Sequence, residues 1–139
     1  MHHAGPERPI LFLDVDGVLM VATSVMLSDG TWSPDVGLVP DAAAMLAQLA
    51  VAFDIHWATR WGESANSQLS PELGLPILPV VELSGPKTQW TKLPAIREAA
   101  GSRPAAWIDD DLGHEEWSWA DNRREPTMLV QTEDRKSVV

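Results

Sequence analysis

Residues 10–19 read Ile-Leu-Phe-Leu-Asp-Val-Asp-Gly-Val-Leu, and this stretch decides the fold expected of the whole chain. Its apolar start, directly after Pro9, is typical of a strand buried in a parallel sheet. Asp14 and Asp16 follow at positions i and i+2, and alternate side chains of an extended backbone point to the same side. Two carboxylates this close repel each other unless a cation or a shared proton compensates. Because these are hard oxygen donors, the pattern favours Mg²⁺.

Short apolar runs alternate with helical patterns along the rest of the chain. Residues 20–39 contain Asp29-Gly30, a turn signal that predicts a hairpin or flap. We expect helices at 41–52, 93–100 and 115–120, and a helix or loop at 61–69. The expected strands are residues 10–13, 53–58, 77–83, 105–108 and 127–131. This alternation predicts an α/β fold in which helices cover both faces of a doubly wound parallel sheet.

The bulk composition sets limits on the class of protein. A chain of 139 residues is expected to form a single domain, residues 1–139, with residues 1–8 as a flexible tail. The formal net charge of −10 argues against broad nucleic-acid binding, which depends on lysine and arginine, so a nucleic acid is expected only as a substrate. The sequence has no cysteine, which excludes disulfides and thiolate chemistry. No apolar run approaches the roughly 20 residues that span a bilayer, and the expected location is the cytoplasm.

The segment around Asp14 resembles the first motif of the haloacid dehalogenase-like superfamily, an apolar strand followed by Asp-x-Asp-Gly-x-Leu. The resemblance implies an Mg²⁺-dependent enzyme in which Asp14 is the nucleophile and forms an aspartyl-phosphate. It makes Asp16 the general acid and base, with a backbone carbonyl that binds the metal. It also implies a sheet of order 3-2-1-4-5, with the site where the strands end.

Three further segments resemble the other motifs of this superfamily. Residues 53–59, Phe-Asp-Ile-His-Trp-Ala-Thr, form a strand that ends at Thr59, whose hydroxyl would hold a phosphate oxygen, and Arg60 would add a contact to the same group. Residues 107–111, Trp-Ile-Asp-Asp-Asp, would complete the metal shell through Asp110, with Asp109 supporting it directly or through water.

The motif lysine, which would neutralise the phosphate, has two candidates, Lys92 and Lys87. Lys92 is preferred because it stands at the start of an expected helix, where its position is better fixed. Seven tryptophans are present, and Trp61 directly follows Arg60. It is expected to border the pocket, where it could stack on a base or another aromatic part of a substrate.

Several stretches are closer still to a subgroup of this superfamily, the phosphatase-like domains linked to bacterial RNA repair. They are residues 57–66, 92–96 and 103–110. One departure is the absence of a helix after the last strand, which puts stability or oligomeric state in question more than chemistry. The short segments 19–53 and 83–92 predict a member without a cap domain. An open site of this kind favours either a large substrate or a cap provided by a partner subunit.

The expected activity is therefore phosphomonoester hydrolysis on a phosphorylated small molecule or macromolecular end. Two alternatives stay open. The first is a phosphatase that processes nucleic-acid ends, and the second is a non-catalytic module that binds phosphate or a partner. Retention of Asp16 argues against a true dehalogenase, because displacement at carbon needs no such acid.

Overall fold

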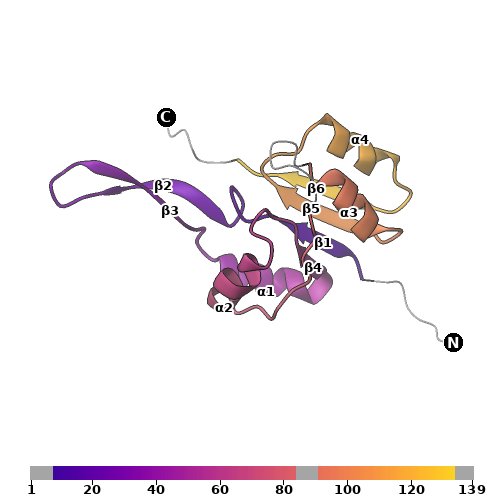
Figure 1. Cartoon of the computed structure of the whole chain (residues 1–139), viewed down its shortest axis with the longest axis horizontal. Helices are drawn as coiled ribbons and strands as arrows, with labels where there is room; N and C mark the ends of the chain where they lie inside the picture. Colours follow the sequence, from indigo (N-terminus) through magenta and orange to yellow (C-terminus); the bar gives the residue numbers. More distant parts are fainter. Residues whose placement is uncertain (1–7, 84–90, 134–139) are drawn as a thin grey trace.

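A computed structural model describes residues 8–83 and 91–133. Its centre is a four-stranded parallel sheet of order β4-β1-β5-β6 (Figure 1). The strands are β1 Ile10–Leu13, β4 Asp54–Trp57, β5 Ala105–Asp109 and β6 Thr127–Gln131. The predicted α/β class with a parallel sheet is confirmed. In this order β1 and β5 are neighbours, so their carboxyl ends meet at one edge.

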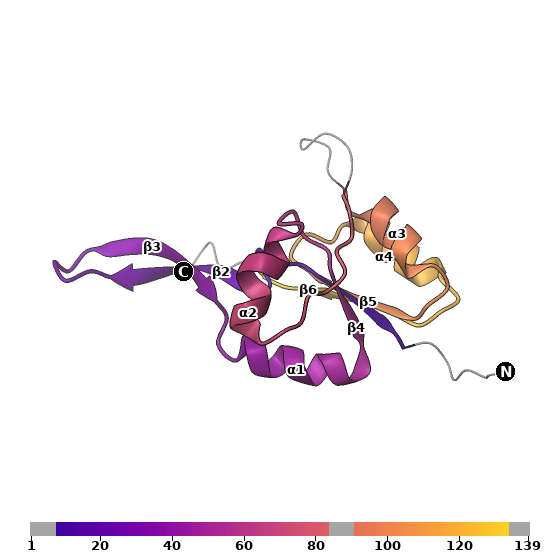
Figure 2. The same cartoon turned by 60° about the horizontal axis from the view of Figure 1, so that its bottom comes forward.

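Helices cover both faces of this sheet (Figure 2). On one face lie α1 Ala42–Ala52, the π-helical turn η1 Ala65–Leu69 and α2 Ser70–Leu73. On the other lie α3 Leu93–Ala100 and α4 His114–Asn122. The residues of β1 alternate between two buried clusters, with Leu11 and Leu13 in the first and Ile10 and Phe12 in the second. This alternation explains why the strand is apolar throughout, and it fixes β1 rigidly at the centre of the sheet.

The predicted hairpin is present as β2 Met20–Met26 paired antiparallel with β3 Trp32–Leu38. It projects from the body of the molecule as a narrow two-stranded arm (Figure 1). At the turn, the Asp29 carboxylate accepts hydrogen bonds from the backbone N–H and the hydroxyl of Thr31, at 2.9 and 2.6 Å. Near its tip Trp32 is 64% exposed. At its base the Val39 N–H donates to the Leu19 carbonyl at 2.8 Å, which closes the arm where it leaves the body.

The predicted strand at 77–83 is wrong, because this segment makes only one parallel bridge to the sheet, between Val80 and Trp57. Pro76 and Pro79 have no N–H with which to extend a ladder. The Leu78 N–H donates to Oδ1 of Asn66, at 2.9 Å, and not to a neighbouring strand.

Asn66 anchors this segment to the first core cluster. Its Oδ1 accepts the indole N–H of Trp57 at 3.0 Å, and its Nδ2 donates to the carbonyl of Leu78 at 2.9 Å. Because Asn66 and Trp57 are both buried, these bonds satisfy polar groups that water cannot reach. This side chain thus adds to the two backbone hydrogen bonds that join the segment to β4, from the Trp57 N–H to the Pro79 carbonyl and from the Val81 N–H to the Trp57 carbonyl.

Within residues 8–83 and 91–133, no helix has the length and apolar character needed to cross a membrane.

Candidate metal centre at the carboxyl edge of the sheet

The neighbouring strands β1 and β5 bring three carboxylates together at the edge where they end. Leu13 pairs with Ile108, so Asp14 and Asp109 emerge side by side, and the Asp14 N–H donates to the Ile108 carbonyl at 3.1 Å. Asp14 is 6% exposed and Asp109 is 2% exposed. One carboxylate oxygen from each of Asp14, Asp109 and Asp110 lies within 4.8 Å of the other two. Such a group of hard donors, two of them buried, could hold a cation.

Lys92 lies between two of these carboxylates. Its Nζ is 3.1 Å from Asp14 Oδ1 and 2.7 Å from Asp109 Oδ2, and it also donates to the carbonyl of Ala58 at 2.9 Å. The residue directly precedes α3, as the sequence predicted. Three carboxylates and one ammonium leave the cluster two charges negative when all four groups are ionised. Lys87 lies outside the described residues.

Burial raises the pKa of Asp14 from 3.8 to about 7, and the nearby Asp109 carboxylate adds to this effect. The Lys92 ammonium and the Val15 N–H, which donates to Asp14 Oδ1 at 2.8 Å, both act in the opposite direction. The carboxylate is thus costly to ionise in the bare protein. A bound divalent cation would remove much of this cost, because it adds positive charge beside the group.

Gly17 makes room for the third carboxylate. Its φ is +77°, and a Cβ at this position would stand 2.1 Å from Asp110 Oδ2 and 2.5 Å from its Cγ. No other residue type fits without displacing Asp110. The Gly17 carbonyl also accepts the hydroxyl of Thr132, at 2.7 Å, which ties the loop after β1 to the residue after β6. The glycine of the Asp-x-Asp-Gly motif therefore has a steric role in building the cluster.

The Asp16 carboxylate is outside the group of three. It is exposed and accepts the indole N–H of Trp61, with Nε1 at 3.2 Å from each of its two oxygens. The backbone of Asp16 bridges to Met20 at the start of the hairpin. Of the four aspartates expected at the metal, the structure brings three side chains together and holds the fourth on an indole beside them.

Thr59 follows β4 and is buried, and its Oγ1 accepts the backbone N–H of Trp61 at 3.2 Å. Its neighbour Ala58 supplies the carbonyl that binds Lys92, so Thr59 is one residue from that contact. Arg60 is exposed. Binding of phosphate by Thr59 and Arg60 stays a prediction.

Two further residues support the cluster that the sequence did not single out for this role. The indole N–H of Trp107 donates to Asp109 Oδ2 at 3.2 Å, and the Gln131 amide donates to the Asp110 carbonyl. Trp107 and Asp109 are two residues apart on β5, so both side chains point to one face of the sheet. This i, i+2 spacing is the feature of the sequence from which the contact could have been predicted. Asp109 pairs with Gln131 in the sheet, which places the amide at the same edge.

The residues present could hold a metal ion. Asp14, Asp109 and Asp110 supply oxygen donors, and among the described residues neither a histidine nor a thiol joins them. The contact between Gly17 and Asp110 shows that the loop leaves space for the third carboxylate. The expected metal site is therefore supported as a three-aspartate cluster that could hold a metal ion.

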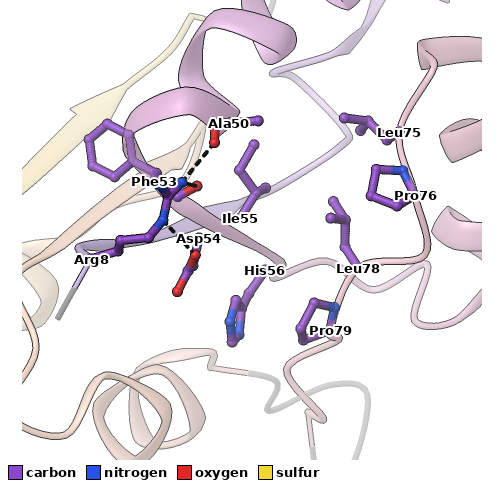
Figure 3. Close-up of a pocket in the computed structure, with 10 residues that line it drawn as sticks. All are labelled: Arg8, Ala50, Phe53, Asp54, Ile55, His56, Leu75, Pro76, Leu78 and Pro79. Carbon is purple, nitrogen blue, oxygen red and sulfur yellow. Dashed lines mark hydrogen bonds and ion pairs between the residues drawn. The ribbon is translucent and has the colours of Figure 1, made fainter. Parts of the chain in front are cut away.

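A cavity of about 340 Å³ lies elsewhere, beside β4 and the segment 75–79 (Figure 3). Arg8 at its edge resembles an anion site, but its guanidinium already donates to Asp54 and to three backbone carbonyls. Those carbonyls belong to Ala50, Val51 and Phe53. The cavity wall is otherwise largely apolar, with leucine and proline side chains facing Ile55 (Figure 3). This cavity holds none of the carboxylates of the candidate site.

No protein-family model matches this chain, and no curated protein matches it. What the structure shows is a parallel α/β fold with a buried acidic cluster that could hold a metal ion.

Proposed function

We propose that this protein is an Mg²⁺-dependent phosphomonoester hydrolase in which Asp14 is the nucleophile. The observation that carries the proposal is the position of Lys92 Nζ between Asp14 and Asp109, next to a third carboxylate. A partly buried ammonium and a carboxylate cluster that could hold a cation make a site suited to an anionic substrate. The resemblance of residues 10–19 to a phosphoryl-transfer motif supports the same reading.

Each residue of the site has a separate role in the proposed reaction. The Val15 N–H and Lys92 hold Asp14 Oδ1 and so fix the rotation of the carboxylate. An oxygen of Asp14 attacks phosphorus as the bond from phosphorus to the ester oxygen breaks. Lys92 offsets charge on the phosphoryl oxygens, and Mg²⁺, when bound, supplies further neutralisation of that charge.

Asp16 acts first as the general acid and then as the general base. It donates one to the departing ester oxygen, which leaves as an alcohol. It then takes a proton from the water that hydrolyses the aspartyl-phosphate. That second step releases inorganic phosphate and restores Asp14. Thr59 and Arg60 are proposed to bind phosphoryl oxygens.

The decisive experiment is phosphate release from p-nitrophenyl phosphate with Mg²⁺ and with EDTA. Release that depends on Mg²⁺ is expected, and Asp14→Asn should reduce it by at least about 100-fold, because the asparagine amide lacks the carboxylate that forms the intermediate. Asp121→Asn, an exposed aspartate on α4, is the matched control and should retain full turnover. Normal turnover by Asp14→Asn would overturn the assignment of the nucleophile.

A wider panel identifies the substrate. It should contain sugar phosphates, phosphopeptides and oligonucleotides phosphorylated at the 3′ or the 5′ end. Turnover far higher on the oligonucleotides would identify an enzyme that processes nucleic-acid ends. Magnesium binding without turnover of any member would instead identify a non-catalytic module and refute the proposed hydrolase.

A further inference from the structure

Asp16 is exposed but is fixed at both its backbone and its side chain. Its backbone bridges to Met20, and the Gly17 N–H donates to the Met20 carbonyl at 2.8 Å. Its two carboxylate oxygens share the indole N–H of Trp61, at 3.2 Å each. An exposed aspartate ordinarily samples several rotamers, and ordering it costs entropy. Here one donor, 45 residues away in the chain, contacts both carboxylate oxygens and favours this arrangement.

Trp61 is itself held by the buried end of β4. Its backbone N–H donates to the hydroxyl of Thr59, which is only 2% exposed. Its ring packs against the core cluster that contains Leu13 and Trp57. The contacts therefore run from the core, through Trp61, to Asp16.

This hydrogen bond is better suited to positioning than to stabilising the fold. It joins a neutral donor to a solvent-exposed carboxylate, and because water competes for both groups its contribution to folding is modest. The indole N–H donates and never accepts, so it holds the carboxyl group without taking up its proton. It can remain on one oxygen while the other carries the proton.

We infer that Trp61 is a positioning residue, whose indole N–H holds Asp16 in place to protonate the leaving oxygen. The inference rests on the proposed function. In the step concerned, the bond from Asp14 to phosphorus forms as the bond from phosphorus to the ester oxygen breaks. The carboxyl proton of Asp16 moves to that oxygen. An alkoxide needs this proton to leave, whereas p-nitrophenolate leaves without it.

The test compares Trp61→Phe with the unsubstituted protein on an alkyl phosphate, glycerol phosphate, and on p-nitrophenyl phosphate. Phenylalanine keeps an aromatic ring but loses the donor together with part of the volume of the indole. We expect kcat for glycerol phosphate to fall about tenfold with little change in KM. For p-nitrophenyl phosphate the fall should be no more than about threefold. The control is Trp117→Phe, at an exposed tryptophan on α4, which should turn over both substrates normally.

A double-mutant cycle separates this role from a purely structural one. In an Asp16→Asn background, adding Trp61→Phe should cause no further loss on glycerol phosphate, because the group it positions is gone. Equal losses on both substrates, or losses that multiply in the double variant, would overturn the inference and leave the hydrolase intact. No Mg²⁺-dependent release from either substrate by the unsubstituted protein would overturn the proposed function and this inference together.

Discussion

Replacing Asp14 with asparagine should make the metal-free protein more stable at neutral and alkaline pH. The pKa of Asp14 is raised from 3.8 to about 7, mainly by burial. The difference is about three units, and each unit corresponds to about 1.4 kcal/mol. Ionising Asp14 in the folded protein therefore costs at most about 4 kcal/mol. Relaxation of the site lowers this figure, and we expect a gain of about 2–3 kcal/mol in the free energy of unfolding.

The sign of the pH dependence follows from where each state releases its proton. The unfolded chain loses the Asp14 proton near pH 3.8, and the folded protein keeps it until about pH 7. Between these values the folded state binds more protons, so its stability falls as the pH rises. Asparagine has no proton to lose. The gap between Asp14→Asn and the unsubstituted protein should thus be small near pH 4, widen up to about pH 7 and stay constant above it.

Urea denaturation in EDTA, followed by tryptophan fluorescence at several pH values, measures this gap. Other titrating groups are common to both proteins and cancel in the difference. Asp121→Asn is the control and should shift stability by only a few tenths of a kcal/mol, equally at every pH. Addition of Mg²⁺ at pH 8 should stabilise the unsubstituted protein more than Asp14→Asn. A gap that is absent or independent of pH would refute the account of Asp14 as a buried, destabilising carboxylate.

Three other substitutions test particular contacts. Gly17→Ala should weaken Mg²⁺ binding by at least about tenfold in a calorimetric titration, because its Cβ would collide with the Asp110 carboxylate; unchanged affinity would contradict the fit described for this loop. Lys92→Met should lower the free energy of unfolding by about 3–5 kcal/mol, since Asp14 and Asp109 lose the ammonium between them, and Lys87→Met should have no such effect in the same urea experiment. Asn66→Leu should cost about 2–4 kcal/mol, because it leaves the buried indole N–H of Trp57 without an acceptor; a thermal melt no lower than that of the unsubstituted protein would show that the network is dispensable.

The sequence was sufficient to predict where the carboxylates meet. Asp14 and Asp109 each end an apolar run, and parallel strands that are neighbours in the sheet bring such ends to one edge. The sequence left open whether Asp109 or Asp110 faces the metal, and both belong to the cluster. The reason is that the backbone turns after β5, which brings the two adjacent carboxylates to one place.

Contacts between distant side chains were beyond the reach of pattern arguments. The bond from Trp61 to Asp16 depends on how the loop after β4 lies against the loop after β1, and no periodicity encodes that distance. The error at 77–83 was of another kind, because Pro79 was visible and argues against a regular strand. The apolar pattern outweighed it, whereas the structure holds this segment through Asn66 and a single bridge to Trp57.

The closed base of the β2–β3 arm has a consequence for how this chain can be altered. The Val39 N–H and the Leu19 carbonyl join the two ends of residues 20–38 before the arm leaves the body. This hydrogen bond therefore sets the distance between the two ends of the arm, whatever the length or sequence of the residues between them. This makes the arm a natural insertion point, where a reporter domain or a longer ribbon can be spliced in while the sheet keeps its register. An insertion at the start of the arm would lie close to Asp16, whose backbone bridges to Met20.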